Sequence, residues 1–233
     1  MPTTASAPQI RNDFDTIARL MPGTDHLGPH EVWLLENLPS GRGTALEIGC
    51  GVGHLARRLS SAFDRVVAID FSEGMIAEAR RRTAEYFRIE FACADIFDWL
   101  RRSPNTYDCI VTVATLHHVD LRSALRAMAQ SLKPGGRLLV LDLFRRSGWR
   151  NVLINGAAFV VARAHEMVAF SGIAPWKLRR AYWQHGRNET YLTLDEVERA
   201  AREELPDSIV RGHLLWRYSV IWDKPVSGEL GAA

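Results

Sequence analysis

The sequence predicts an α/β fold, a doubly wound and mostly parallel sheet, on three observations. Short apolar segments alternate with amphipathic ones from residue 44 to residue 143, as strands and helices do in such folds. The apolar segments are nearly continuous, which is typical of parallel strands covered by helices on both faces. A glycine turn, G-x-G-x-G at residues 49–53, links the first strand to a helix. Such a turn brings bare backbone against a ligand beside a helix N-terminus.

Seven strands are expected in all. Five belong to the alternating core, at 44–48, 65–69, 89–92, 107–113 and 136–143, and the helices between them lie at 54–63, 73–84, 96–101 and 121–132. Two last strands, 210–215 and 218–222, are expected to form an antiparallel edge pair. The helix before them, 194–203, opens with a capping box at Thr193–Glu196. Two helices at 12–21 and 30–38 precede the first strand and are expected to cover one end of the sheet.

A chain of 233 residues is long enough for one sizeable domain and marginal for two. We expect a single domain over residues 1–233. Its parts are an N-terminal helical cap (1–40), a core (41–143), an insertion (144–192), and a final helix with its strand pair (193–225). The insertion holds an apolar helical segment at 149–170 and an aromatic, basic stretch at 176–186.

Composition excludes several classes of protein. The formal net charge of +2 is too small to favour a nucleic-acid partner. The three cysteines are odd in number and lack metal spacing, so we expect reduced thiols in a reducing compartment. No apolar run is long enough to span a membrane, and residues 1–8 do not resemble a signal peptide. We therefore expect a cytoplasmic protein; the oligomeric state stays unknown.

Polar residues stand where each core strand is expected to end. They are Glu47 and the glycines, Asp70, Asp95, the stretch from Ala114 to His118, and Asp142. Open α/β sheets bind ligands beyond the carboxyl ends of their strands, so these positions predict one site.

Three carboxylates at this edge suggest a nucleoside-like ligand. Asp70, about twenty residues after the glycine turn, could accept hydrogen bonds from both hydroxyls of a ribose. Asp95 could accept from an exocyclic amine of a base. Glu47 could meet a cationic amino group, because a buried carboxylate without a partner is costly. Helix capping is the structural alternative for Asp70 and Asp95.

Five segments in this order resemble class I S-adenosylmethionine-dependent methyltransferases. They are E-I-G-C-G-V-G (47–53), A-I-D-F-S-E-G-M (68–75), C-A-D-I (93–96), Y-D-C-I-V-T-V-A-T-L-H-H-V (107–119) and L-K-P-G-G-R-L-L-V-L-D (132–142). The resemblance covers about residues 43–143 and a closing strand pair. The leading F-D-x-I-A at 14–18 and Leu-His-His-Val are similar to the small-molecule, ubiquinone/menaquinone-methylating type.

The resemblance implies a Rossmann-like methyltransferase fold that binds S-adenosyl-L-methionine. It implies that Gly49, Gly51 and Gly53, with Cys50 in the same turn, cradle the methionine moiety, and that Glu47 supports it. Further implied contacts are Asp70 to the ribose, Phe71 and Met75 to the adenosine, Ala94, Asp95 and Ile96 to the adenine, and Ala114 beside the sulfonium.

Methyl transfer needs mainly alignment of nucleophile, methyl and sulfur, and a hydroxyl acceptor also benefits from a base. His117 and His118 lie beyond the fourth strand, and one of them could be that base; the family pattern favours His118. Their alternative role is to shape the loop. The spacing of His26 and the adjacent His30 and Glu31 could suggest a metal site, but Gly28-Pro29 interrupts any helix between them and no further convergent ligand is evident, so no metal is expected.

The acceptor side is expected to come from the N-terminal helices and the insertion. Its aromatic residues suit a small apolar or aromatic acceptor, with two or three of them as pocket walls: Phe159, Phe170, Trp176, Tyr182 and Trp183. O-methylation is favoured, and N- or C-methylation stays open. The competing hypotheses are a non-catalytic cofactor-binding protein and a nucleotide-dependent oxidoreductase. G-x-G-x-G disfavours the latter, because a dinucleotide fingerprint needs glycine where the chain has His54.

Overall fold

The computed structural model describes residues 7–21, 29–145, 176–186, 191–213 and 216–226. The apolar helix expected at 149–170, with Phe159 and Phe170, lies outside these residues, as does His26.

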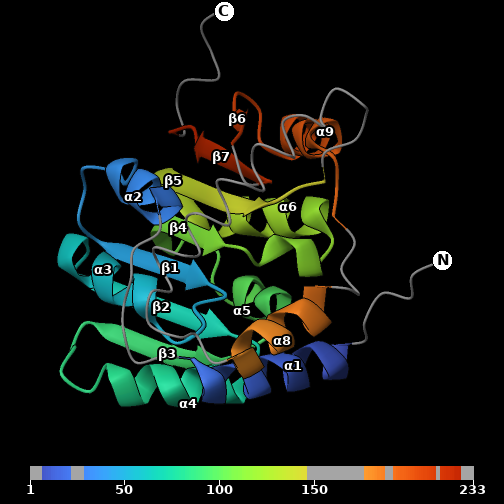
Figure 1. Ribbon diagram of the computed structural model, residues 1–233. Coiled ribbons are helices and arrows are strands. Elements are labelled where there is room, and N and C mark those ends of the chain that lie inside the picture. The colour runs from blue at the N-terminus through green and yellow to red at the C-terminus, as the bar shows by residue number, and fades with distance from the viewer. Residues whose placement is uncertain (1–6, 22–28, 146–175, 187–190, 214–215, 227–233) are drawn as a thin grey trace, which may run out of the picture.

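A seven-stranded sheet forms the centre of the molecule (Figure 1). Its strands lie in the order β3-β2-β1-β4-β5-β7-β6, and the first five are parallel. β7 runs antiparallel to both β5 and β6, which confirms the expected fold class and antiparallel pair. The strand bounds are β1 Thr44–Ile48, β2 Arg65–Asp70, β3 Ile89–Cys93, β4 Tyr107–Val113, β5 Leu132–Leu143, β6 Ile209–Gly212 and β7 Arg217–Asp223.

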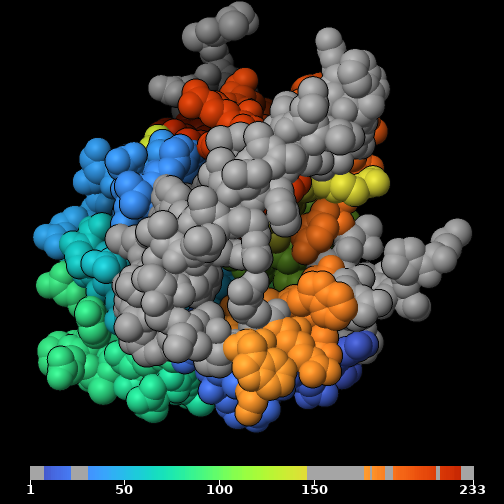
Figure 2. Space-filling model, in the orientation of Figure 1, coloured from blue at the N-terminus to red at the C-terminus, as the bar shows by residue number. Residues whose placement is uncertain are grey.

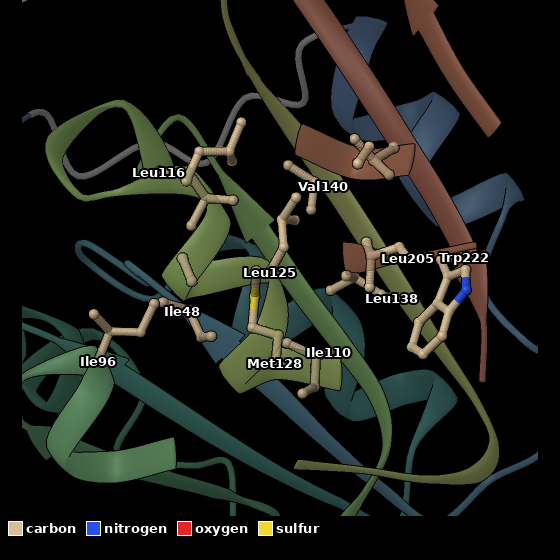
Figure 3. Close-up of a cluster of buried hydrophobic side chains, with 14 of the residues drawn as sticks. Ile48, Ile96, Ile110, Leu116, Leu125, Met128, Leu138, Val140, Leu205 and Trp222 are labelled. Carbon is tan, nitrogen blue, oxygen red and sulfur yellow. The ribbon is translucent and has the colours of Figure 1, made fainter. Parts of the chain in front are cut away.

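Two apolar clusters hold helices against the two faces of the sheet, because alternate strand residues point to opposite faces. Ala45, Val66 and Cys109 face one cluster, beneath α2 (Pro29–Glu36), α3 (His54–Ala62) and α4 (Glu73–Arg82). Ile48, Ile110 and Val140 face the other, in which Leu125, Met128 and Leu205 also lie (Figure 3). Its helices are α5 (Ile96–Arg101), α6 (Leu121–Ser131) and α9 (Leu194–Glu204).

Two further helices, α1 (Ala7–Leu20) and α8 (Trp176–Gly186), lie side by side, and α1 also packs against α4 (Figures 1 and 2). Ile17 and Ala18 of α1 pack with Leu178 of α8 on Val52 and Met75, which follow β1 and β2. The two helices therefore cover the carboxyl ends of these strands. None of the described helices is long and apolar enough to cross a membrane.

The first helix starts earlier than expected, and one of its carboxylates bonds to the start of α4. α1 begins at Ala7 rather than near residue 12, so Asp13 and Asp15 lie inside the helix. Asp15 accepts hydrogen bonds from the Ser72 hydroxyl and the Gly74 N–H at the start of α4, at 2.5 and 2.9 Å. Ser72 caps α4, accepting from Met75 N–H at 3.0 Å.

Candidate cofactor and active site

A cavity of ≈ 270 Å³ lies at the carboxyl ends of the parallel strands, beneath α1 and α8. Its walls come from the segments after β1, β2, β3 and β4 and from the two covering helices. The lining residues are Ile10, Phe14, Met21, Ile48, Gly49, Gly51, Val52, Ile69, Asp70, Phe71, Met75, Ala94, Asp95, Ile96, Ala114, Thr115, His118, Val119 and Tyr182. Segments that are far apart in sequence thus form one site, at the edge where open α/β sheets bind ligands.

Most residues expected at the site line this cavity. They are Gly49, Gly51, Asp70, Phe71, Met75, Ala94, Asp95, Ile96, Ala114 and His118. Four others lie outside the lining: Glu47, Cys50, Gly53 and His117. Cys50 is buried in the cluster beneath α3, where burial raises its pKa well above the usual thiol range, so it stays a thiol.

The three glycines of the turn serve different purposes. All have positive φ, which favours glycine. A Cβ on Gly49 would lie 2.0 Å from the Thr115 hydroxyl, and one on Gly53 would lie 2.8 Å from the Phe91 ring. At Gly51 the nearest atom would be Met75 Sδ, at 4.0 Å. Gly49 and Gly53 therefore permit close packing, whereas Gly51 leaves its side open toward the cavity.

The Asp70 carboxylate is fixed by backbone donors at the centre of the cavity wall. Its Oδ2 accepts from Gly51 N–H at 2.8 Å and its Oδ1 from Ser72 N–H at 2.9 Å. Burial raises the pKa of Asp70, and these N–H groups partly offset that effect. A carboxylate has about four lone-pair positions, so both oxygens keep capacity for ligand donors.

The segment after β3 serves both helix and cavity. Asp95 caps α5, its Oδ1 accepting from Phe97 and Asp98 N–H at 2.8 and 3.1 Å, so the structural alternative is present. Asp95 also lines the cavity between Ala94 and Ile96. Across the cavity, Ala114 follows β4 with φ 50, a left-handed conformation that is uncommon for alanine.

Glu47 is buried at the end of β1, and its Oε2 has no hydrogen-bond partner in the described part of the chain. Burial raises the pKa of this carboxyl well above its usual range, and the Asp70 and Glu31 carboxylates raise it further. The Arg57 guanidinium lowers it only in part. The ionised form of Glu47 therefore weakens the ligand-free fold.

We expect Glu47→Gln to raise the melting temperature of the ligand-free protein. Because the folded-state pKa is raised, wild type loses stability as pH rises from the unfolded value of about 4.3 through the folded value. The gain should thus be small near pH 4.5 and largest at pH 8, with about 2–4 °C for each kcal/mol. Thermal unfolding at both pH values measures it. Glu85→Gln, in an exposed turn, is the control; an equal gain there, or none at pH 8, would contradict the expectation.

His117 and His118 point to different surroundings. His118 lines the cavity, where its ring lies 5.6 Å from Phe14, edge to face. His117 Nδ1 lies 2.6 Å from Asp142 Oδ1, and both side chains are buried. Among the described residues, no group of three or more His, Cys, Asp or Glu could hold a metal ion.

The N-terminal helices and the insertion were expected beside the site, but the residues of α1 that line the cavity were not assigned to it from the sequence. Phe14, Ile10 and Met21 of the α1 segment and Tyr182 of α8 line it. The F-D-x-I-A similarity pointed to Phe14, but no local pattern shows where this helix packs. Of the described insertion aromatics, Tyr182 lines the cavity and Trp176 and Trp183 are exposed. His185 of α8 packs on Phe14 and His118, with ring centroids 4.7 and 5.2 Å apart.

The cavity fits an adenosine-containing ligand. The open side of Gly51 leaves room for a ligand against the backbone, and the fixed Asp70 carboxylate suits hydroxyl donors. Phe71, Met75 and Ile96 provide apolar surfaces for a flat ring. We find no group in this lining that opposes the nucleoside part of S-adenosylmethionine.

Comparison with known proteins agrees with this fit. Residues 45–136 match a family described as a methyltransferase domain. An uncharacterised methyltransferase of Mycobacterium tuberculosis is 30% identical over 194 residues, 81% of this chain and 91% of the relative. A ubiquinone biosynthesis O-methyltransferase of Xylella fastidiosa is 31% identical over 131 residues, 55% of this chain and 53% of that protein.

The fold also matches a phosphoethanolamine N-methyltransferase of Haemonchus contortus, solved with phosphomonomethylethanolamine and S-adenosylhomocysteine. The TM-score is 0.65 at 16% identity, covering 93% of this chain and 60% of the other. Motif order, sheet topology, cavity and relatives agree: this chain belongs to the class I methyltransferases and uses S-adenosyl-L-methionine as its methyl donor.

Proposed function

We propose that the enzyme methylates a hydroxyl of a small apolar or aromatic acceptor, with His118 as the base. The position of His118 carries this proposal: it lines the same cavity as Ala114, Gly51 and Asp70. The wall around it is aromatic and apolar, from Phe14 and Val119. A basic ring in an apolar wall suits an acceptor that must lose a proton.

Each part of S-adenosylmethionine is assigned to the residues whose chemistry suits it. We propose that Asp70 accepts from the ribose hydroxyls and that Phe71 and Met75 pack on the adenosine. Ala94, Asp95 and Ile96 would hold the adenine. Gly49 and Gly51 would make room for the methionine part, with Glu47 beneath the turn as the carboxylate that supports its amino group. Gly53 and Cys50 would support the turn by packing beneath it, Gly53 against Phe91 and Cys50 in the buried cluster under α3.

S-adenosylmethionine supplies an electrophilic methyl group and a good leaving group. The protein itself then has to position the acceptor and to remove its proton. The walls from α1 and α8 exclude water and hold the acceptor in line, which can supply several kcal/mol of the barrier. His118 takes the proton of the acceptor hydroxyl as oxygen attacks. We place His117 outside this proton transfer, because its Nδ1 contacts Asp142 instead.

The relative from Xylella fastidiosa, a ubiquinone biosynthesis O-methyltransferase, supports a quinol-like acceptor. The net charge of +2 favours a small molecule over a nucleic acid as the partner. N- and C-methylation are the alternatives, and an acceptor panel separates them.

We expect 1-naphthol to be methylated on oxygen and 1-naphthylamine, its matched amine, to be methylated at least about tenfold more slowly. Isotope-labelled S-adenosylmethionine followed by NMR of the product distinguishes an O-methyl from an N- or C-methyl group. Faster methylation of the amine or of a ring carbon would overturn the hydroxyl assignment. Absence of transfer to a panel of phenols and quinols would do the same.

A further inference from the structure

A second cavity, of ≈ 360 Å³, lies on the other side of the η1 turn (Leu116–His118). It opens between α6 and α9, at the ends of β5 and β7. The turn separates the two cavities: His118 lines the first, His117 lines the second, and Val119 contributes to both. The proposed reaction does not use the second cavity.

His117 and Asp142 form a buried pair at this cavity, with side chains 7% and 1% exposed. His117 Nδ1 lies 2.6 Å from Asp142 Oδ1, and Asp142 Oδ2 accepts the backbone N–H of His117 at 3.1 Å. A carboxylate at Nδ1 fixes the tautomer of a neutral imidazole, with the proton on Nδ1. Nε2 is then a hydrogen-bond acceptor, and it has no partner within the described ranges.

Tyr218 adds a donor to the same cavity. It pairs with Asp142 across β5 and β7, and its hydroxyl has no hydrogen-bond partner in the part of the chain described. Burial raises the pKa of Tyr218 well above its usual range, and the Asp142 carboxylate adds to that effect. The phenol group therefore keeps its proton. A hydroxyl group both donates and accepts, so it matches Nε2 and this phenol together.

The lining also offers apolar surface for the body of a neutral ligand. Half of its residues are apolar: Leu116, Val119, Leu121, Leu143, Leu192 and Ala200. The formal charges of the lining cancel, because the two arginines, Arg122 and Arg199, are matched in number by two carboxylates, Asp120 and Glu196. Both carboxylates already cap helices, Asp120 at Ser123 N–H and Glu196 at Thr193 N–H. An ionic ligand gains no net attraction here.

We propose that the second cavity is a binding site for a small neutral phenol, whose hydroxyl donates to His117 Nε2 and accepts from Tyr218. The site is separate from the cofactor cavity, so its occupancy does not depend on the proposed reaction. Its test measures binding without turnover, and it can therefore fail while the proposed reaction holds, or the reverse.

The first test titrates phenol and anisole into the full chain saturated with S-adenosylhomocysteine, followed by NMR line positions or calorimetry. Anisole has the same ring but no hydroxyl proton to donate. We expect phenol to bind at least about tenfold more tightly, because a buried acceptor that loses its hydrogen bond costs about this factor. Equal affinity for both molecules, or saturable binding of neither, would overturn the proposal.

Variants locate the bound molecule. Leu192→Trp should fill the cavity from its exposed rim and reduce phenol affinity at least about tenfold, whereas Val32→Trp, at an exposed position of α2, should leave it unchanged. Tyr218→Phe should weaken phenol binding several-fold and anisole binding little. Phenol affinity that is unchanged in Leu192→Trp would place the molecule elsewhere and overturn the assignment.

Discussion

Replacing His118 with glutamine should lower kcat for a hydroxyl acceptor by about 10²–10⁴, the usual contribution of a general base. The side chain lines the cavity beside the Ala114 and Thr115 segment, so its loss should act on the proton transfer. The affinity for S-adenosylhomocysteine should change little, since Asp70 and the glycine turn stay in place. Steady-state kinetics with calorimetry measures both quantities.

The pH dependence of kcat separates a base from a residue that only shapes the cavity. In wild type, kcat should rise with pH as the base loses its proton, and this rise should disappear in His118→Gln. His213→Gln is the matched control, because His213 bonds Ser219 at 2.7 Å and lines neither cavity. A His118→Gln enzyme with unchanged kcat and an unchanged pH profile would contradict the assignment.

Replacing Asp70 with alanine should weaken binding of S-adenosylhomocysteine at least about 100-fold. Hydrogen bonds to a charged acceptor contribute about 1.5–3 kcal/mol each, and a factor of 100 corresponds to about 2.8 kcal/mol. The change also removes the acceptor for Gly51 and Ser72 N–H, so part of the loss should come from the turn itself.

Asp70→Asn divides these two contributions. The amide oxygen can still accept from one backbone N–H but carries no charge, so we expect an intermediate affinity. Asp98→Ala removes an exposed carboxylate of α5 that pairs with Arg101, and it should bind like wild type. Calorimetric affinities within threefold of wild type for Asp70→Ala would show that this carboxylate does not hold the nucleoside.

The sheet could be predicted because its signals are local. Each core strand is a short apolar run bounded by turn residues, and β1 and β4 begin and end where expected. Of the polar residues at strand ends, Asp70, Asp95 and His118 line one cavity, because parallel strands share a carboxyl edge, whereas Glu47 and Asp142 lie outside its lining. β5 begins earlier than expected, at Leu132 rather than Gly136, since Leu132 pairs with Tyr107 of β4 across a register shift. No local sequence pattern predicts that pairing.

The covering wall of the cavity could not be predicted in detail, because it depends on contacts between distant segments. Asp13 of α1, for example, has its carboxylate 3.3 Å from His185 Nδ1, in α8, a contact that no local pattern shows. Gly53 shared a motif with Gly51, yet its missing Cβ makes room for Phe91 rather than for a ligand. Spacing along the chain cannot distinguish these two uses of glycine.

The most direct measurement is a crystal structure of the full chain with S-adenosylhomocysteine. We expect the ribose hydroxyls to lie within hydrogen-bond distance of Asp70, the adenine between Phe71 and Ile96, and the sulfur beside Ala114. His118 should face the open side of that sulfur. A nucleoside bound away from Asp70, or a sulfur atom on the far side of the cavity from Ala114, would contradict this expectation.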